Sequence, residues 1–346
     1  MIGRSHGSRD EQPHNYDAVV YISFGGPEGP DDVIPFLENV TRGRSVPRER
    51  LLEVADHYYR FGGVSPINAE NRKVISALEQ ELSERGPALP VYWGNRNWHP
   101  LLNDTVAQMR RDGIRRAIAF VTSAWSSYSG CRQYREDIEK AQEAAGSAAP
   151  KMDKIRQFYN HPGFIAAQAD RVKAVLDSMS EPRRADAHLL FTAHSIPQQM
   201  ADASSYVEQL LEACRLVVEQ VHGSFEWSLA YQSRSGPPHI PWLEPDVSEH
   251  LEKLSSEGMT EVIVVPIGFL SDHMEVRFDL DVEAANIAQE RGLNMLRAKT
   301  VGAHPAYIKM IRDLIIERMQ GSGDRPASGV MGASHDICAV DCCRSN

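Results

Sequence analysis

The chain lacks any long hydrophobic run that would place it in a membrane. No uninterrupted apolar segment approaches the roughly 18 to 20 residues that a spanning helix needs. Residues 1–15 are polar and contain no apolar core of a signal peptide, so they do not resemble a secretory signal. We therefore expect residues 1–15 to form a disordered tail, and we expect a cytoplasmic protein without a membrane span.

An excess of positive charge is also absent. The 346 residues include 37 Lys and Arg against 47 Asp and Glu, which gives a formal net charge of −10. Domains that bind nucleic acid usually carry the opposite sign, so nucleic acid is not an expected partner. The hydrophobic content of 42% and the charged content of 24% are those of a soluble globular protein, and the length allows two domains.

Cysteine is scarce and unevenly distributed. The five cysteines are Cys131, Cys214, Cys338, Cys342 and Cys343. An odd number in a chain without a signal peptide argues against a disulfide framework. Cys214 lies in an apolar helical segment and is expected in the core, whereas the last three lie in a polar tail. That concentration indicates metal binding or redox chemistry.

A complete dinucleotide-binding fingerprint is missing as well. The first apolar run, residues 17–24, is followed by a turn at Gly25-Gly26-Pro27 and a helix that starts near Asp31. The turn lacks the full GxGxxG pattern, which disfavours a dinucleotide as the ligand. Phe24 is expected at the end of this strand, beside any pocket that opens there.

Apolar runs alternate with helical patterns along the rest of the chain, in two series of similar size. Strands are expected at 17–24, from 91, at 117–122 and within 154–180, and then at 187–191, 227–232, 261–267 and 294–298; helices are expected at 68–85, 105–112, 133–145 and 304–319. This alternation predicts parallel sheets with helices on their faces. The boundaries that follow are an N-terminal half at 16–185, a C-terminal half at 186–320 and a cysteine-bearing tail at 321–346.

An acidic stripe follows the strand at 261–267. Glu275, Asp279 and Glu283 are spaced four apart on a predicted helix, so they share one face. Such like charges destabilise a helix by a few tenths of a kcal/mol per pair, and a solvated acidic face is one interpretation. The stripe begins, however, where open α/β sheets bind their ligands. That position favours a path for cations, either protons or a divalent metal.

His194 is expected at the corresponding strand end in the same half. A histidine there is either a hydrogen-bonded structural residue or a ligand. An imidazole and a facing carboxylate can share a proton or a metal, and such a pair suits transient handling of a first-row metal. In the first half, Arg42 and Arg44 precede the aromatic pair at 58–59, which suits a planar ligand with carboxylate arms or an ordinary surface.

Six groups of residues carry a family resemblance. They are residues 23–27 (SFGGP), 59–66 (YRFGGVSP), 95–100 (NRNWHP), 191–197 (FTAHSIP), 231–233 (YQS) together with 241–242 (PW), and 271–275 (SDHME). In this order and spacing, the chain resembles the ferrochelatases, which insert Fe(II) into a porphyrin. The resemblance implies an α/β fold of two Rossmann-like halves, each a parallel sheet flanked by helices, with a porphyrin cleft between them.

The resemblance also implies roles for single residues. His194 resembles the active-site histidine and Glu275 the glutamate that faces it, the pair that handles metal and protons, while Asp279 and Glu283 continue the acidic line. Which of the two takes the proton stays open. Porphyrin-lining positions are Phe24, Arg42, Arg44, Tyr58, Ser65, Trp125 and Tyr128. The phenyl ring of Phe24 cannot be an axial ligand, and His57 stands where relatives carry a propionate-binding arginine.

The substrate and the cofactor are expectations of the same kind. Coproporphyrin III, with four propionates, is the expected porphyrin, and protoporphyrin IX is the alternative. Cys131 with Cys338, Cys342 and Cys343 resembles the ligand set of a [2Fe–2S] cluster; zinc or no metal are the alternatives. Other functions are a porphyrin or haem carrier, an iron–sulfur sensor, or a cobalt or nickel chelatase. The protein is expected to be a monomer or a homodimer.

Overall fold

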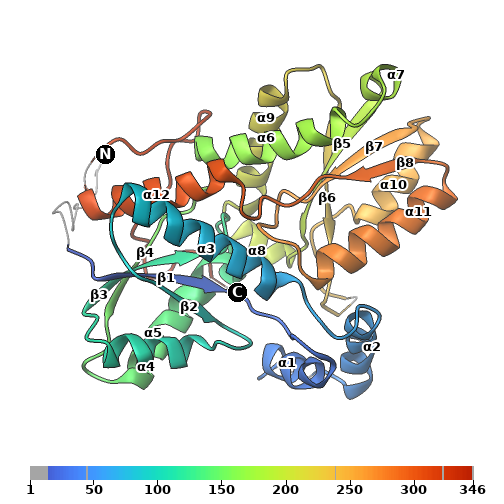
Figure 1. Ribbon diagram of the computed structural model, residues 1–346. Helices are drawn as coiled ribbons and strands as arrows, with labels where there is room; N and C mark the ends of the chain where they lie inside the picture. The colour runs from blue at the N-terminus through green and yellow to red at the C-terminus, as the bar shows by residue number, and fades with distance from the viewer. Residues whose placement is uncertain (1–14, 44–45, 238, 322, 345–346) are drawn as a thin grey trace, which may run out of the picture.

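Two four-stranded parallel sheets form the framework of the protein (Figure 1). The computed structural model describes residues 15–43, 46–237, 239–321 and 323–344. The first sheet has the order β2-β1-β3-β4 and the second the order β6-β5-β7-β8. The strands are β1 Ala18–Ser23, β2 Val91–Asn95, β3 Arg116–Val121, β4 Lys151–Lys154, β5 Ala187–His194, β6 Trp227–Gln232, β7 Glu261–Val265 and β8 Asn294–Arg297. The predicted architecture of parallel sheets flanked by helices is confirmed.

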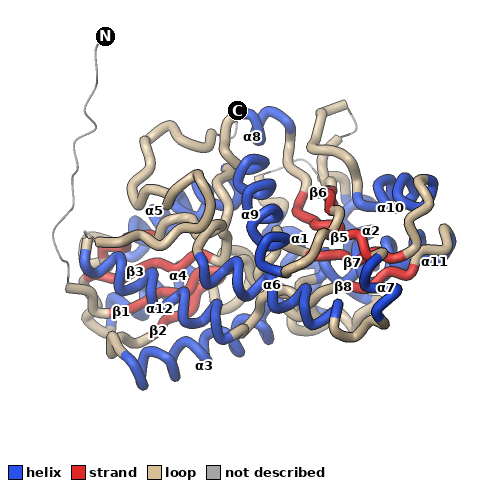
Figure 2. The backbone as a smooth tube through the Cα atoms, turned by 90° about the horizontal axis from the view of Figure 1, so that it is seen from above, coloured by secondary structure: helices blue, strands red, loops and turns tan. Residues whose placement is uncertain are grey.

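Helices cover both sheets, which lie side by side when the molecule is seen from above (Figure 2). Those up to residue 176 are the short η1 Pro30–Asp32 and η2 Tyr128–Arg132, with α1 Val33–Val40, α2 Arg48–Tyr59, α3 Ile67–Arg85, α4 Leu102–Arg111, α5 Gln133–Ala145 and α6 Pro162–Leu176. The later ones are α7 Glu181–Ala185, α8 Gln198–Asp202, α9 Tyr206–Val221, α10 Val247–Ser256, η3 Val276–Ala284, α11 Ala285–Glu290 and α12 Pro305–Gln320. None of the helices in the described parts of the chain is long and apolar enough to cross a membrane.

The central strands are buried on both faces. All residues of β1 and β7 are buried, and so are the residues of β5 before its last one, His194. These strands are rich in Val, Ile and Leu. Continuous apolar strands of this kind are typical of parallel sheets covered by helices on both sides. Parallel pairing brings the carboxyl ends of the strands to one edge of each sheet. Functional side chains that follow β1, β5 and β7 therefore gather at those edges.

The last helix of the chain packs on the first half. Figure 1 shows α12 beside α3 and α6, which matches its contacts. The Tyr307 ring lies 6.4 Å from Phe120 and 6.2 Å from Phe158, centroid to centroid. Glu317 pairs with Arg156, whose Nε lies 2.7 Å from Oε1. The main hydrophobic cluster thus contains residues of both sheets and of α12.

Two local expectations were wrong. The strand expected within 154–180 lies earlier, at β4, because its sequence Lys-Met-Asp-Lys is polar and half-exposed and gives no apolar pattern. The helix that carries the acidic stripe is a π-helix from Val276 to Ala284 rather than an α-helix. π-Helical turns are rare and occur mostly within α-helices, so an ordinary helical pattern in the sequence does not signal them. The tail expected at 1–15 lies, up to residue 14, outside the described residues.

The C-terminal tail runs back over the molecule. The Asn160 side chain donates to the carbonyl oxygens of Ser328 (3.3 Å) and Gly332 (2.7 Å). The backbone N–H of Val330 donates to the Glu212 carboxylate on α9 at 3.1 Å. Further on, Arg132 donates to the carbonyl of Cys342 at 3.2 Å. These polar contacts bring the last cysteines to the helix turn η2.

Candidate active site

His194 and Glu275 face each other in the second half. The imidazole Nε2 of His194, at the end of β5, lies 3.7 Å from Oε2 of Glu275, just before η3. The Nδ1 of His194 hydrogen-bonds the carbonyl of Ser195, and a carbonyl can only accept. In the neutral ring the proton therefore sits on Nδ1, and the Nε2 lone pair points to Glu275, ready to take a proton or a metal.

Gly268 allows the loop after β7 to approach this strand end. A Cβ at this position would lie 2.6 Å from Cα of Ala193, the residue before His194. Such a distance is sterically forbidden, so the loop requires a glycine here. The carbonyl of Gly268 also accepts from the Trp125 indole at 3.2 Å. The first half thus holds the loop that leads to Glu275.

A second imidazole, that of His273, lies beside Glu275, a role that the sequence pattern did not predict. Its Nε2 lies 3.7 Å from the same Oε2, and its Nδ1 accepts from the backbone N–H of Val276 at 3.1 Å. His273 thus caps the start of the helix that leads into η3. Because Nδ1 accepts, Nε2 carries the proton in the neutral ring, and burial lowers the pKa of His273. The signal in the sequence was a histidine two residues before Glu275.

The acidic stripe continues along η3. Asp279 accepts hydrogen bonds from Ser233 and, at 3.3 Å, from Gln232 at the end of β6. Burial, followed by the charge of Glu275, raises the pKa of Asp279 to about 7. Burial, followed by the charge of Asp246, also raises the pKa of Glu283. A carboxyl group with a pKa near 7 can take up and release protons at neutral pH.

Helix α2 of the first half meets the stripe from the opposite side. The His57 ring stacks on Phe278 of η3, with centroids 3.7 Å apart and an interplanar angle of 11°. Arg60 lies over the same ring at 5.6 Å. Burial raises the pKa of Tyr58, and the charges of Glu275 and Asp279 raise it further. Tyr58 therefore lies near the acidic stripe.

The other predicted porphyrin-lining residues divide into two groups. Phe24 is 36% exposed, with an edge-to-face contact to Phe36, and Arg42 is exposed; Arg44 lies outside the described residues. Trp125 and Ser65 are buried, at 3% and 4% exposed, and Tyr128 donates to Glu136 at 3.1 Å. Phe24 and Arg42 are thus open to a ligand, whereas the other three make internal contacts.

Four of the five cysteines are neighbours. Cys131 hydrogen-bonds Cys338, and this bond together with burial raises the pKa of Cys131. The bond to Cys131 lowers the pKa of Cys338, which also contacts Cys342. Burial raises the pKa of Cys342 and Cys343. Cys214 is fully buried on α9, as expected. Within the described ranges, no group of three or more His, Cys, Asp or Glu side chains could hold a metal ion as placed.

Comparison with known proteins identifies the fold and the family of this chain. The fold is that of a chelatase: a sirohydrochlorin chelatase from Bacillus subtilis, solved in complex with cobalt, matches with a TM-score of 0.53 at 11% identity, over 88% of this chain and 95% of the other. That level of identity supports the fold alone. The ferrochelatase family model matches residues 16–319, and the chain belongs to the ferrochelatase family.

Relatives of similar length lie much nearer in sequence. A ferrochelatase from Rhodopirellula baltica is 54% identical, over 95% of this chain and 93% of its own length. A coproporphyrin III ferrochelatase from Streptomyces griseus is 52% identical over 97% and 94%, and one from Streptomyces coelicolor is 50% identical over 95% and 93%. The expected resemblance to ferrochelatases is therefore confirmed over nearly the whole chain.

Proposed function

We propose that this protein inserts Fe(II) into coproporphyrin III to give coprohaem. The observation that carries the proposal is the His194–Glu275 pair, 3.7 Å apart, at the head of a helix lined with carboxylates. The names of the Streptomyces relatives support the choice of porphyrin. Protoporphyrin IX is the alternative, since the Rhodopirellula relative is named only as a ferrochelatase.

The reaction exchanges two pyrrole protons for one ferrous ion. In our proposal, the Nε2 lone pair of His194 accepts a pyrrole proton, because its Nδ1 is held by the Ser195 carbonyl. Glu275 docks the incoming Fe(II), and Nε2 of His273 lies 3.7 Å from the same carboxylate. Asp279 and Glu283 conduct cations along η3, and the raised pKa of Asp279 suits proton release at neutral pH.

The porphyrin itself would lie between the halves. Phe24 would contact the macrocycle without ligating iron, and Arg42, with Arg44, would bind propionates as charge-assisted partners. Tyr58 would line the wall opposite the stripe. Trp125, Ser65 and Tyr128 would not contact the porphyrin directly but would hold the loops that shape the pocket. A cleft that bends the ring would make the pyrrole nitrogens more accessible.

An anaerobic insertion assay tests the reaction and the substrate. The protein and Fe(II) are mixed with coproporphyrin III or protoporphyrin IX, and the loss of free-porphyrin absorption is followed. Turnover with coproporphyrin III is the expected result. Preference for protoporphyrin IX would refute the substrate assignment, and binding of both without insertion would refute the reaction and favour a carrier.

We also propose that Cys131, Cys338, Cys342 and Cys343 bind a [2Fe–2S] cluster. The four thiols fit the group, since a [2Fe–2S] cluster takes four cysteine thiolates. These are divided between two irons and need not converge on one point, unlike the ligands of a single ion. The charges of Lys154 and Arg135 near these thiols suit an anionic cluster. When bound, the cluster would supply a redox-active link between the tail and the first half.

Iron content tests the cluster. Protein purified without oxygen should contain iron and sulfide and show visible sulfur-to-iron absorption. Cys131→Ser should abolish both signals, while Cys214→Ser, at the buried cysteine outside the set, should keep them. Equal iron in both variants, or none in the wild type, would contradict the assignment.

We further propose that the protein is cytoplasmic and is a monomer or a homodimer. Light scattering of the purified protein distinguishes these two states from larger assemblies.

A further inference from the structure

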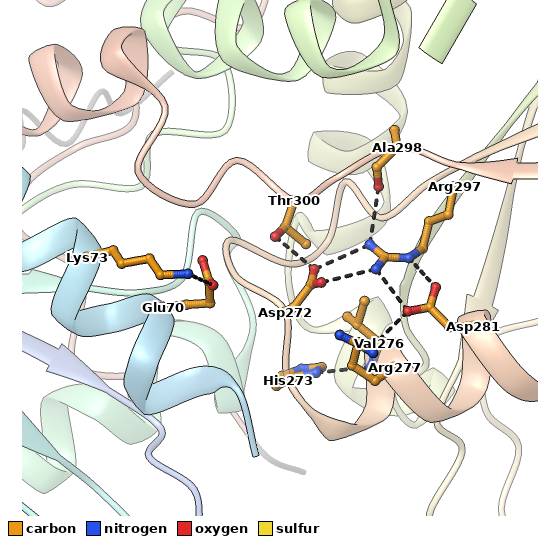
Figure 3. Close-up of polar contacts among 10 residues, drawn as sticks. All are labelled: Glu70, Lys73, Asp272, His273, Val276, Arg277, Asp281, Arg297, Ala298 and Thr300. Atoms are coloured by element: carbon orange, nitrogen blue, oxygen red, sulfur yellow. Dashed lines mark hydrogen bonds and ion pairs between the residues drawn. The ribbon is translucent and has the colours of Figure 1, made fainter. Parts of the chain in front are cut away.

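Arg297, at the end of β8, forms a two-sided clamp behind the iron site (Figure 3). Its Nη1 and Nη2 donate to the two carboxylate oxygens of Asp272, at 3.3 and 3.0 Å. Its Nε donates to Asp281, and its Nη2 also donates to the second oxygen of Asp281 at 3.0 Å. One guanidinium thus binds two carboxylates, and its side chain is only 14% exposed.

Asp272 and Asp281 lie on either side of the segment that carries His273 and Glu275, so Arg297 holds this segment at two points. Asp272 directly precedes His273, and Thr300 donates to Asp272 at 3.0 Å. Asp281 lies on η3, six positions after Glu275, and also pairs with Arg277 at 3.1 Å. Figure 3 shows Asp272 between η3 and α3, and on α3 Glu70 and Lys73 form their own pair. Arg297, Asp272, Asp281 and Thr300 all belong to the second half.

A π-helix needs such support. π-helical hydrogen bonding is rare and usually extends over a single turn, often at functional sites, whereas η3 spans 9 residues. Neighbouring carboxylates add repulsion along the stripe. A planar fork that binds carboxylates on either side fixes geometry as well as charge, which a lysine cannot do. The site at Glu275 thus depends on a contact that touches none of its own atoms.

We propose that Arg297 is a positioning residue for the iron site: by binding Asp272 and Asp281, it fixes His273 and Glu275 relative to His194. This inference rests on the proposed function. Residues that orient metal ligands from behind typically change metal affinity by about 10- to 100-fold when they are replaced. In the described parts of the chain, Arg297 bonds to Asp272, Asp281 and the Ala298 carbonyl and to no predicted porphyrin-lining residue, so porphyrin binding should not depend on it.

The test measures metal binding to the porphyrin-free protein, with Co(II) as the probe and its visible absorption as the signal. Arg297→Met should weaken Co(II) binding by about 10-fold or more, while coproporphyrin III still quenches fluorescence as in the wild type. Arg297→Lys should recover part of the Co(II) affinity. In insertion assays, Arg297→Met should raise KM for Fe(II) more than it lowers kcat.

A matched control is present at the far end of the same sheet. Arg183 makes a similar fork to Glu261, with both distances 2.8 Å, at the amino end of β7. Arg183→Met should lose stability but keep Co(II) affinity. Equal weakening in both variants, or wild-type affinity in folded Arg297→Met, would overturn the inference.

A second variant covers the case in which Arg297→Met does not fold. Asp281→Asn keeps Arg297 and its bond to Asp272, and it should weaken Co(II) binding to a smaller extent; unchanged affinity would overturn the inference. A wild-type protein that binds Co(II) at this site but inserts no Fe(II) would refute the proposed function, while the positioning test still gives its answer. Absence of Co(II) binding in the wild type would overturn the positioning role itself.

Discussion

The two halves share one scaffold and differ in the chemistry at their strand ends. Both sheets place their second strand at the edge, then the first, third and fourth. The first strand of the N-terminal half ends at Ser23, followed by Phe24, whereas the first strand of the C-terminal half ends at His194. Glu275 follows the third strand of the same half. The repeated fold thus provides two equivalent edges, and the pair of His194 and Glu275 occupies the edge of the second sheet.

This difference indicates a division of labour. An aromatic side chain at a strand end, such as Phe24, suits contact with a macrocycle, and an edge with imidazoles and carboxylates suits protons and metal ions. The first half would then determine how tightly the porphyrin binds, and the second how fast the metal enters. Variants in the two halves should affect different measurements.

The largest effect is expected at His194. His194→Ala removes the proposed proton acceptor and should lower the insertion rate by about 10²- to 10⁴-fold, with porphyrin binding retained in a fluorescence titration. Phe24→Ala, at the corresponding strand end of the first half, should weaken porphyrin binding and spare kcat. If the two variants changed the same parameter, the division between the halves would be refuted.

The next largest effect concerns the contact between α12 and the first half. Arg156 is fully buried and forms a fork with Glu317, so Arg156→Met leaves a nearly buried carboxylate without its charge partner. We expect unfolding free energy to fall by about 3 to 5 kcal/mol in denaturant titrations. Arg50→Met removes the ion pair of Arg50 with Glu53, whose side chains are 54% and 61% exposed. This variant should change the unfolding free energy by less than about 1 kcal/mol. Equal losses of unfolding free energy in the two variants would contradict the larger contribution expected of the buried pair.

A smaller effect depends on pH and concerns the second half. The pKa of Asp279 is raised from 3.8 to about 7, so between these values the folded protein holds a proton that the unfolded chain has lost. Stability contributed by this group is therefore present at low pH and lost as pH rises to about 7. Asp279→Asn should remove this slope, which is at most about 1.4 kcal/mol per pH unit. Denaturant titrations across this range check it; identical slopes in both proteins would contradict the raised pKa.

The smallest effect joins the halves directly. His57 stacks on Phe278, and stacked ring pairs contribute about 0.5 to 1.5 kcal/mol beyond their buried area. A double-mutant cycle of His57→Ala and Phe278→Leu should give a coupling energy in that range. A coupling of zero would show that α2 and η3 touch without stabilising each other.

Much of this arrangement follows from sequence patterns, because apolar strands and the residues after them are local features. The strand ends at His194 and Phe24 and the acidic spacing of Glu275 could be predicted in this way. The role of His273 could not, since a histidine at a helix start also reads as a cap. Arg297 lies 25 positions from Asp272 and 16 from Asp281, and no local pattern links them.

The burial of Trp125 and Ser65 could not be predicted, for a related reason. Both belong to loops, where the pattern of apolar residues does not distinguish a pocket wall from the layer behind it. Trp125 donates to Gly268, which is 143 positions away. The packing of the two halves determines which face of the Trp125 ring is covered.

The position of α12 has a consequence for how the protein is made. The ribosome releases the first sheet long before Tyr307, which packs on Phe120 of that sheet in the finished molecule. Domains usually fold in the order of their synthesis. Here the nascent first half would keep an apolar face uncovered until nearly the whole chain has emerged. Ribosome-bound fragments that end before Pro305 should therefore be strong clients of chaperones that bind exposed hydrophobic surface.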